Sequence, residues 1–527
     1  MANGRKLLVV GLILAVFGAL AVAGGPALSP GDTPEQSAAV DLGETDGDEG
    51  TADSSDTDGA GEQSGDADQV PQVVGECAAE QPEDFADPDA DVVGWVEGYW
   101  YDEPLDINAS GGIDQEELER LAARTAARVE AMRCINADEG VPPVEIQPRE
   151  QFQEEQAGLF ENVSEAERLF DNAVLETMLL VDSETSSIDQ REANRGTSVG
   201  GTYNFLEDEI TIVSDDPENL RIDEEILAHE IGHAVQDQQF NLSQYDRPTT
   251  DIDKGTLGLI EGDVTLIERQ YLDACENGGW EGGCVTEASG PEGGGSTPAN
   301  WGLYFQNFQP YSDGPAFVEY VYEQRGWDGV NDLYEDPPSS AIQIVEPDRF
   351  PELQPSEVTV ADESTAEWER LDTPQGPDYD TLGIASISAM FMTPLYESQG
   401  AFTIYGAEEI LNGEGALSPL EYDHPETEGW RGGSVYAYHG GANRTGTVWK
   451  TQWAEPADWE PFVASYEELI EFRGGEAVGD RTYTFPDESG YEMAVTIVTE
   501  GNNVTIVTAP TVEELDEIHD VSPATGS

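Results

Sequence analysis

The chain has 527 residues, of which 22 are Lys or Arg and 109 are Asp or Glu, and its formal net charge is −87. This charge excludes nucleic acid as a partner, because a phosphate backbone would be repelled. A hydrophobic content of 38% with 10 Trp supports folded cores and argues against an acidic disordered protein. Such a charge is tolerable in molar salt, where the Debye length is about 3 Å, so the composition is typical of a halophilic microbe.

Residues 1–25 are expected to be a signal peptide or an N-terminal membrane anchor. Arg5 and Lys6 precede an almost wholly apolar run, and Ala21-Val22-Ala23 offers a cleavage site of the A-x-A type. The run is slightly shorter than the roughly 20 residues of a membrane span, so cleavage and retention both stay open. We expect an extracellular or cell-surface protein whose only membrane association is through this segment.

The remaining chain is divided by composition. Residues 26–72 are rich in Gly, Ser, Thr and acids and are expected to be a disordered acidic linker. A first folded domain is expected at 73–350, a second linker at 351–380, a C-terminal α+β domain at 381–520 and a tail at 521–527. The oligomeric state is left open by the sequence.

Four cysteines are present, and an even number in an exported protein indicates disulfides. Cys275 and Cys284 flank a short Gly-rich stretch and are expected to pair with each other. Cys77 and Cys134 would then form the second disulfide, which joins the start of the first domain to its first helix.

Residues 106–117, D-I-N-A-S-G-G-I-D-Q-E-E, fit the pattern of a calcium loop. The oxygen ligands would come from Asp106, Asn108, Ser110, Asp114 and Glu117. Pro104 argues against the usual entering helix. Asp114 and Glu117 also fit the N-cap of an amphipathic helix at 114–134. A Ca²⁺ site and a plain helix cap therefore both remain open.

The motif H-E-x-x-H occurs within residues 223–239. On a helix, His229 and His233 lie one turn apart on the same face, so both rings can reach one ion, at about 2.0–2.1 Å for zinc. Glu230 can then act as the general base for a metal-bound water. The alternative is a structural helix with two incidental histidines.

A third metal ligand is expected from the apolar helix that follows. We choose Glu261, because an acid inside an apolar run is costly unless it is paired or bound to a metal. Asp263 and Glu268 are its competitors for this position. Asp263 could instead hold a histidine ring from behind, and so could Asp237, one turn past the second histidine.

The sequence HEIGHAVQDQQF followed by a GLIEGD helix resembles the gluzincin type of zinc metallopeptidase. More narrowly, it is similar to a poorly characterised group of secreted or lipid-anchored microbial proteins that are predicted metallopeptidases. Their pattern runs HELxHALQDQHF, EGDA, PYxxGxxFV, GWxAV and PPxSTEQILHP. The corresponding stretches here are 310–318, 326–330 and 337–347. Gln239 and Glu346 stand where the group has histidines, which leaves the role of those histidines in doubt here.

The resemblance implies an α+β fold, with a mainly helical zincin-like core and a small β-sheet, followed by the C-terminal α+β unit. The segments 199–204 and 209–213 predict a β-hairpin just before the motif helix. By resemblance, such a strand lines the cleft and pairs with an extended peptide, although it could simply cover the core. Tyr311 is our choice for a hydroxyl that stabilises the oxyanion of a tetrahedral intermediate.

These observations predict an extracytoplasmic zinc metallopeptidase acting on a peptide or protein substrate. Zn²⁺ would be held by His229, His233 and Glu261, although Mn²⁺ or Co²⁺ would accept the same ligands. The rival interpretation is a non-catalytic metal-binding surface or adhesion protein, and a third is a calcium-dependent adhesin. The presence of Glu230 favours the enzyme, because a structural site needs only its ligands.

Overall fold

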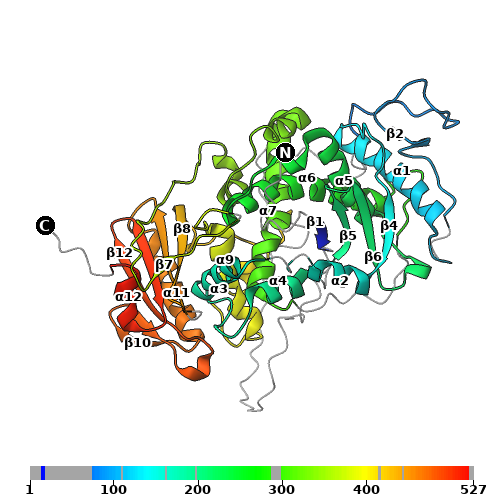
Figure 1. Ribbon diagram of the computed structural model, residues 1–527. Helices are drawn as coiled ribbons and strands as arrows, with labels where there is room; N and C mark the ends of the chain where they lie inside the picture. Colours follow the sequence, from blue (N-terminus) through cyan, green and yellow to red (C-terminus); the bar gives the residue numbers. More distant parts are fainter. Residues whose placement is uncertain are drawn as a thin grey trace, which may run out of the picture.

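The computed structural model describes most of the chain beyond the N-terminal region (Figure 1). The described residues are 13–17, 74–107, 111–158, 160, 163–195, 199–286, 298–374, 376–412, 417–441 and 444–520. The expected acidic linker at 26–72 and the tail at 521–527 lie outside them, as does most of the N-terminal apolar segment. Among the described residues, no helix combines the length and the apolar character that a membrane span requires.

The fold combines helices and sheets, and its first part contains a four-stranded sheet in the order β1-β5-β6-β4. Its strands are β1 (Ile13–Phe17), β4 (Val144–Pro148), β5 (Val199–Asn204) and β6 (Glu209–Ser214). β5 and β6 form the predicted antiparallel hairpin, whose last pair is Asn204 with Glu209. β4 joins β6 in parallel, and β1 pairs antiparallel with the outer edge of β5. A separate two-stranded ribbon is formed by β2 (Trp95–Val96) and β3 (Tyr99–Trp100).

Helices surround this sheet and form most of the first part (Figure 1). They are α1 (Gln115–Arg133), α2 (Arg149–Gly158), α3 (Glu165–Thr177), α4 (Ser187–Arg195), α5 (Glu224–Phe240), α6 (Thr250–Glu276), α7 (Trp301–Leu333) and α8 (Ala341–Val345). In α7 the backbone leaves the helical conformation at Gly326, which has a φ of 65° and kinks the element. The H-E-x-x-H motif lies on α5 and the chosen third ligand on α6, as the sequence predicts.

Glycines allow α6 and α7 to touch through their backbones. A Cβ on Gly262 would lie 2.4 Å from the carbonyl carbon of Gly314, and a Cβ on Gly314 would lie 2.4 Å from the carbonyl oxygen of Gly258. No side chain fits at such distances. This close approach gives a physical reason for the glycine in the PYxxGxxFV-like stretch and places α7 against the helix that carries Glu261.

The C-terminal part is a seven-stranded sheet in the order β10-β11-β12-β13-β9-β8-β7. Its strands are β7 (Glu369–Arg370), β8 (Trp430–His439), β9 (Thr445–Trp453), β10 (Glu476–Gly479), β11 (Thr482–Thr484), β12 (Ala494–Glu500) and β13 (Asn503–Ala509). The helices of this part are α9 (Ile384–Glu397), α10 (Ala407–Ile410), α11 (Trp459–Phe472) and α12 (Val512–Ile518). Helices and a sheet are thus combined in this part of the chain, where an α+β unit was expected.

One hydrophobic core joins the two parts. Leu175 of α3 and Phe305 of α7 belong to the same buried cluster as Phe391, Trp449 and Phe462. The expected linker at 351–380 is also packed rather than free. It supplies β7 to the sheet, and Trp368 within it is buried at 1% exposure. The acids and prolines of this stretch suggested a linker, but its few large apolar residues attach it to the sheet.

Both expected disulfides are present, Cys77–Cys134 and Cys275–Cys284. Disulfides persist mainly in oxidising compartments outside the cytoplasm, so the two bonds are typical of an exported protein.

Candidate metal centre

Helix α5 presents the H-E-x-x-H residues on a buried face. His229 is 1% exposed, and Glu230 and His233 are 0% exposed. Between them, Gly232 faces α6, where a Cβ would come within 2.8 Å of Val264 Cγ1. The glycine of the motif therefore lets α5 lie close enough to α6 for the histidines to reach it.

The predicted ligands converge at one point. His229 Nε2 and His233 Nε2 lie 3.0 Å apart, and Glu261 Oε2 lies 3.6 Å and 3.3 Å from these two nitrogens. Ligands at zinc–ligand distances of 2.0–2.1 Å in a tetrahedron are separated by about 3.3 Å. The triad therefore has the spacing that one small ion needs, and the three residues form a buried cluster able to hold a metal ion.

The electrostatics of the triad favour a cation at its centre. Glu261 Oε2 is buried and accepts no hydrogen bond among the described residues. Burial alone would raise the pKa of Glu261, but the two histidines outweigh it and hold that pKa at about 2. Burial lowers the pKa of His233, which favours the neutral ring that a metal requires. An ionised carboxylate and imidazole nitrogens facing one point form a donor set that Zn²⁺, Mn²⁺ and Co²⁺ accept.

Each histidine is held from behind through its other ring nitrogen. His229 Nδ1 lies 2.8 Å from Glu268 Oε2, and His233 Nδ1 lies 3.0 Å from Gln236 Oε1. A carboxylate and an amide oxygen can only accept here, so both Nδ1 atoms donate, and both Nε2 atoms face the triad, where a neutral ring offers its lone pair to an ion. Such outer contacts fix the ring orientation and tautomer of metal-ligating histidines. Glu268 thus acts behind the site rather than as a ligand of the triad.

Gln236 continues into a buried hydrogen-bond network. Its Nε2 donates to the Tyr334 hydroxyl at 2.7 Å, and this hydroxyl donates to Asp263 Oδ2 at 2.8 Å. Arg133 from α1 closes the network by donating to Asp263 Oδ1 at 2.7 Å. Asp263 therefore supports His233 through Gln236, not by the direct contact that we expected as one alternative.

Asp237 does not contact a histidine ring from behind, as we expected as one alternative. It accepts hydrogen bonds from the Tyr203 hydroxyl at 3.0 Å and from the Leu242 N–H at 2.7 Å. The reason is geometric, because the side chain of Asp237 points toward β5 and the end of its own helix. It therefore joins the hairpin to α5, whereas Gln236 supports His233.

The strand β5 passes directly beside the expected general base. A Cβ on Gly201 would come within 3.0 Å of both Glu230 Cγ and Glu230 Oε1. On the opposite helix, the ring of Tyr311 is stacked with the ring of His229 at a centroid distance of 6.4 Å. The structure therefore brings Glu230, Tyr311 and the strand edge together around the triad.

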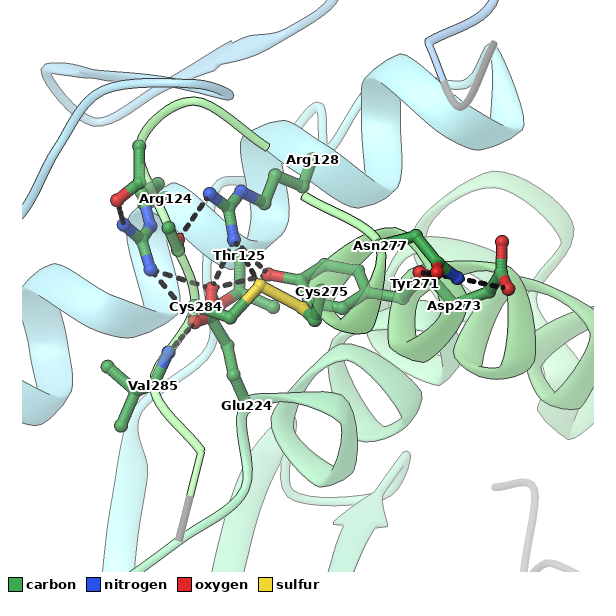
Figure 2. The surroundings of a disulfide bond; sticks show 12 residues. Arg124, Thr125, Arg128, Glu224, Tyr271, Asp273, Cys275, Asn277, Cys284 and Val285 are labelled. Atoms are coloured by element: carbon green, nitrogen blue, oxygen red, sulfur yellow. Dashed lines mark hydrogen bonds and ion pairs between the residues drawn. A yellow bond between two sulfur atoms is a disulfide. The ribbon is translucent and has the colours of Figure 1, made fainter. Parts of the chain in front are cut away.

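The first turn of α5 is anchored by a buried charge cluster (Figure 2). Glu224 accepts hydrogen bonds from Arg124 at 2.8 and 2.9 Å and from Arg128 at 3.0 Å, both on α1. It also accepts from the Tyr271 hydroxyl of α6 and, at 2.8 Å, from the N–H of Val285. One carboxylate thus fixes the start of the motif helix to two other helices and to the loop that follows Cys284.

The described residues of the expected calcium loop form a helix N-cap, which was the alternative to a Ca²⁺ site. Asp114 caps α1 by accepting from the Glu117 N–H at 2.9 Å, and the Glu117 carboxylate accepts from the Asp114 N–H at 3.2 Å. Both carboxylates thus serve the helix cap. Asn108 and Ser110 lie outside the described residues, so the loop as a whole is not defined. Among the described residues, the triad on α5 and α6 is the cluster with metal-ligand spacing.

The sequence predictions did not assign the roles of two residues that hold the histidines from behind, Glu268 and Gln236. Glu268 was named only as a competing ligand, although it lies seven residues after Glu261 and so occupies the same face of α6 two turns later. Gln236, three residues after His233, was not considered. The helical spacing of both residues relative to the ligands was available in the sequence as a signal.

Comparison with known proteins gives one match. A family model described as "Domain of unknown function (DUF8575)" matches residues 369–519. The match begins at the first residue of β7 and ends just after α12, so it covers the C-terminal part and leaves out the metal centre. It begins at 369 rather than at the expected boundary of 381. No curated protein and no solved structure matches the chain.

Proposed function

We propose that the protein is a zinc-dependent metallopeptidase of the gluzincin type that acts outside the cytoplasm. The observation that carries the proposal is the buried triad of His229, His233 and Glu261 with Glu230 beside it. A structural zinc site is closed by four protein ligands, whereas this triad supplies three and has an acid beside it that could act on a water in the fourth position. The two disulfides support an extracytoplasmic location.

A Zn²⁺ ion bound by the triad would supply a Lewis acid that polarises the scissile carbonyl and lowers the pKa of a coordinated water. The side chains then divide the proton transfers. Glu230 accepts a proton from the attacking water and passes it to the amide nitrogen as the C–N bond breaks. The water oxygen ends in the new carboxylate. Tyr311, whose ring is stacked with that of His229, would donate its hydroxyl hydrogen bond to the carbonyl oxygen as negative charge develops there.

The outer edge of β5 supports an extended peptide as the substrate. In the structure β1 occupies this edge in antiparallel pairing, so a substrate strand would take the place of β1 there. A substrate strand on the same edge would pass beside Glu230, because Gly201 of β5 lies against that side chain. Strand addition of this kind provides affinity through main-chain hydrogen bonds and leaves the alternate side chains to determine specificity.

The test is metal content and peptide cleavage on the purified protein in molar KCl. We expect about one zinc per chain by mass spectrometry, and loss of this zinc in Glu261→Ala. Glu276→Ala is the matched control, because Glu276 is an exposed acid on the same helix and should leave the zinc in place. Glu230→Gln should keep its zinc and lose cleavage. Full proteolytic activity in Glu230→Gln, or a wild-type chain without any transition metal, would overturn the proposal.

A further inference from the structure

Arg269 is a half-buried residue on α6 at the side of the triad. Its guanidinium donates to the backbone oxygen of Leu417 and, at 3.4 Å, to that of Tyr311. Two neighbours of Arg269 contact His229. Glu268, the preceding residue in the chain, accepts a hydrogen bond from the His229 ring, and the ring of Tyr311 is stacked with it. Arg269 thus contacts a residue whose ring is stacked with the ring of His229, one of the expected metal ligands.

The contacts of Arg269 differ from those of the fully buried cations. Each of the buried ones forms an ion pair, namely Arg124, Arg128, Arg133, Arg247 and Lys254. No carboxylate of the described residues lies within 4.0 Å of Arg269, although the chain has 109 acids. Among the described residues its guanidinium donates to two carbonyl oxygens, and burial lowers its pKa. A half-buried guanidinium that pairs with no carboxylate of the described residues therefore contacts Tyr311, beside the ring of His229.

We propose that Arg269 binds a carboxylate of the peptide substrate, close to the bond that is cut. This inference rests on the proposed peptidase function and names the class of substrate for it. A guanidinium has five N–H donors, and two carbonyl contacts leave donors free for a carboxylate, which it matches in geometry. The carboxylate could be the C-terminal group of the peptide or an Asp or Glu side chain near the scissile bond.

The net charge of the chain explains why such a contact would matter. At −87, the protein repels an anionic peptide at long range, and salt only screens this repulsion. Attraction must therefore come from direct contact with a cation in a partly dry place, where screening is weakest. Arg168 is comparably buried and, within the described part of the chain, donates to the backbone oxygens of Phe160 and Val163, but it lies on α3 rather than on the helices of the triad. It provides a matched control.

The experiment begins with a peptide mixture digested by the wild-type protein, with cleavage sites identified by mass spectrometry. The best substrate is then synthesised in three forms: with a free C-terminus, with an amidated C-terminus, and with Asn or Gln in place of its acids. We expect the loss of one specific carboxylate to lower kcat/KM by roughly 10–100-fold. If amidation lowers kcat/KM, the bound group is the C-terminal carboxylate of the peptide. If Asn or Gln in place of the acids lowers it, the bound group is an acidic side chain.

Arg269→Gln should remove this preference, so that carboxylate and blocked peptides are cut at the same reduced rate. Arg168→Gln should leave the preference intact. Binding is measured separately with Glu230→Gln, which should bind the carboxylate peptide more tightly than its blocked form by a similar factor. This measurement needs no turnover and does not depend on the folding of the Arg269 variant.

The outcomes separate the inference from the function on which it rests. Equal cleavage and equal binding of all three peptides by proteins with intact Arg269 would overturn the carboxylate inference alone. A preference that survives in folded, zinc-loaded Arg269→Gln would do the same. Cleavage that is absent from the wild-type protein for every peptide would instead overturn the proposed peptidase function.

Discussion

Glu268 Oε2 lies 2.8 Å from His229 Nδ1, on the side of the ring that faces away from the triad. Because an ionised carboxylate only accepts, the contact places a proton on Nδ1, and in the neutral ring the Nε2 lone pair is then directed at Glu261 and His233. Two carboxylates on α6, separated by two turns, thus act on one histidine from opposite sides. Burial lowers the pKa of His229, but Glu261 and Glu268 together raise it to about 10, which shows how strongly they favour positive charge here.

Removal of Glu268 should weaken metal binding without removing a ligand. We expect Glu268→Ala to lower zinc affinity by about 10–100-fold, because the ring of His229 loses its orientation and part of its basicity. The measurement is a competition titration against a chromophoric chelator at fixed pH and salt. Glu276→Ala, an exposed acid on the same helix, is the control. Unchanged zinc affinity in Glu268→Ala would show that the contact is incidental.

The close packing of α6 on α7 predicts a strong effect of a single methyl group. Gly262→Ala would place a Cβ 2.4 Å from the Gly314 backbone, so one helix must move. We expect a loss of about 1–3 kcal/mol in the free energy of unfolding, the usual cost of overpacking, together with weaker zinc binding because Glu261 is the neighbouring residue.

The control for this variant is Gly158→Ala at the end of α2. A Cβ there meets no atom within 4 Å, so the variant should be neutral or slightly more stable. Unfolding is followed by urea titration at constant KCl concentration. Equal stability of Gly262→Ala and the wild-type protein would contradict the packing argument.

The sequence predicted which residues form the buried His and Glu cluster, because that cluster depends on local spacing. One turn of helix determines the relative positions of His229, Glu230 and His233. An acid in the next apolar helix was therefore the expected third ligand. The supports of the site come from distant parts of the chain instead. Arg133 and Tyr334, which hold Asp263, are separated from each other by 201 positions in their numbering, 334 − 133. No periodic pattern relates such residues.

The linker prediction for 351–380 differs from the structure for a related reason. Composition measures how many residues are polar, whereas attachment depends on where the few apolar residues lie. Trp368 and Val360 pack into one buried cluster with strands of the C-terminal sheet, and Leu353 and Leu371 belong to two other buried clusters. The charge cluster around Glu224 was also missed, because its arginines lie on a helix about 100 residues earlier.

Buried acids predict how stability changes with pH. Burial raises the pKa of Glu176 from 4.5 to about 7 despite a hydrogen bond from Ser183. In the unfolded chain the group ionises near 4.5, so folding is favoured by the protonated form. The contribution is fully present below pH 4.5 and is lost as the pH rises to about 7. Glu176→Gln should therefore be more stable than the wild-type protein above pH 7, by about 1–3 kcal/mol.

The difference between Glu176→Gln and the wild-type protein should vanish toward pH 4.5. Urea unfolding at pH 5, 6, 7 and 8 in constant salt measures it. Glu184→Gln, a nearby exposed position, should show no such trend. A stability difference that grows as the pH falls would contradict the sign of the argument.

The anchor of α5 gives the last prediction. Glu224→Ala would leave Arg124 and Arg128 buried with no carboxylate between them, and breaking a buried ion pair in this way costs about 3–5 kcal/mol. Glu225→Gln is the control, because Glu225 is the next residue on the same helix and forms no ion pair among the described residues. Because Glu224 fixes the first turn of the helix that carries His229, zinc affinity should fall together with stability in Glu224→Ala only. A variant that lost stability but bound zinc as tightly as the wild-type protein would show that the cluster stabilises the fold without positioning the metal ligands.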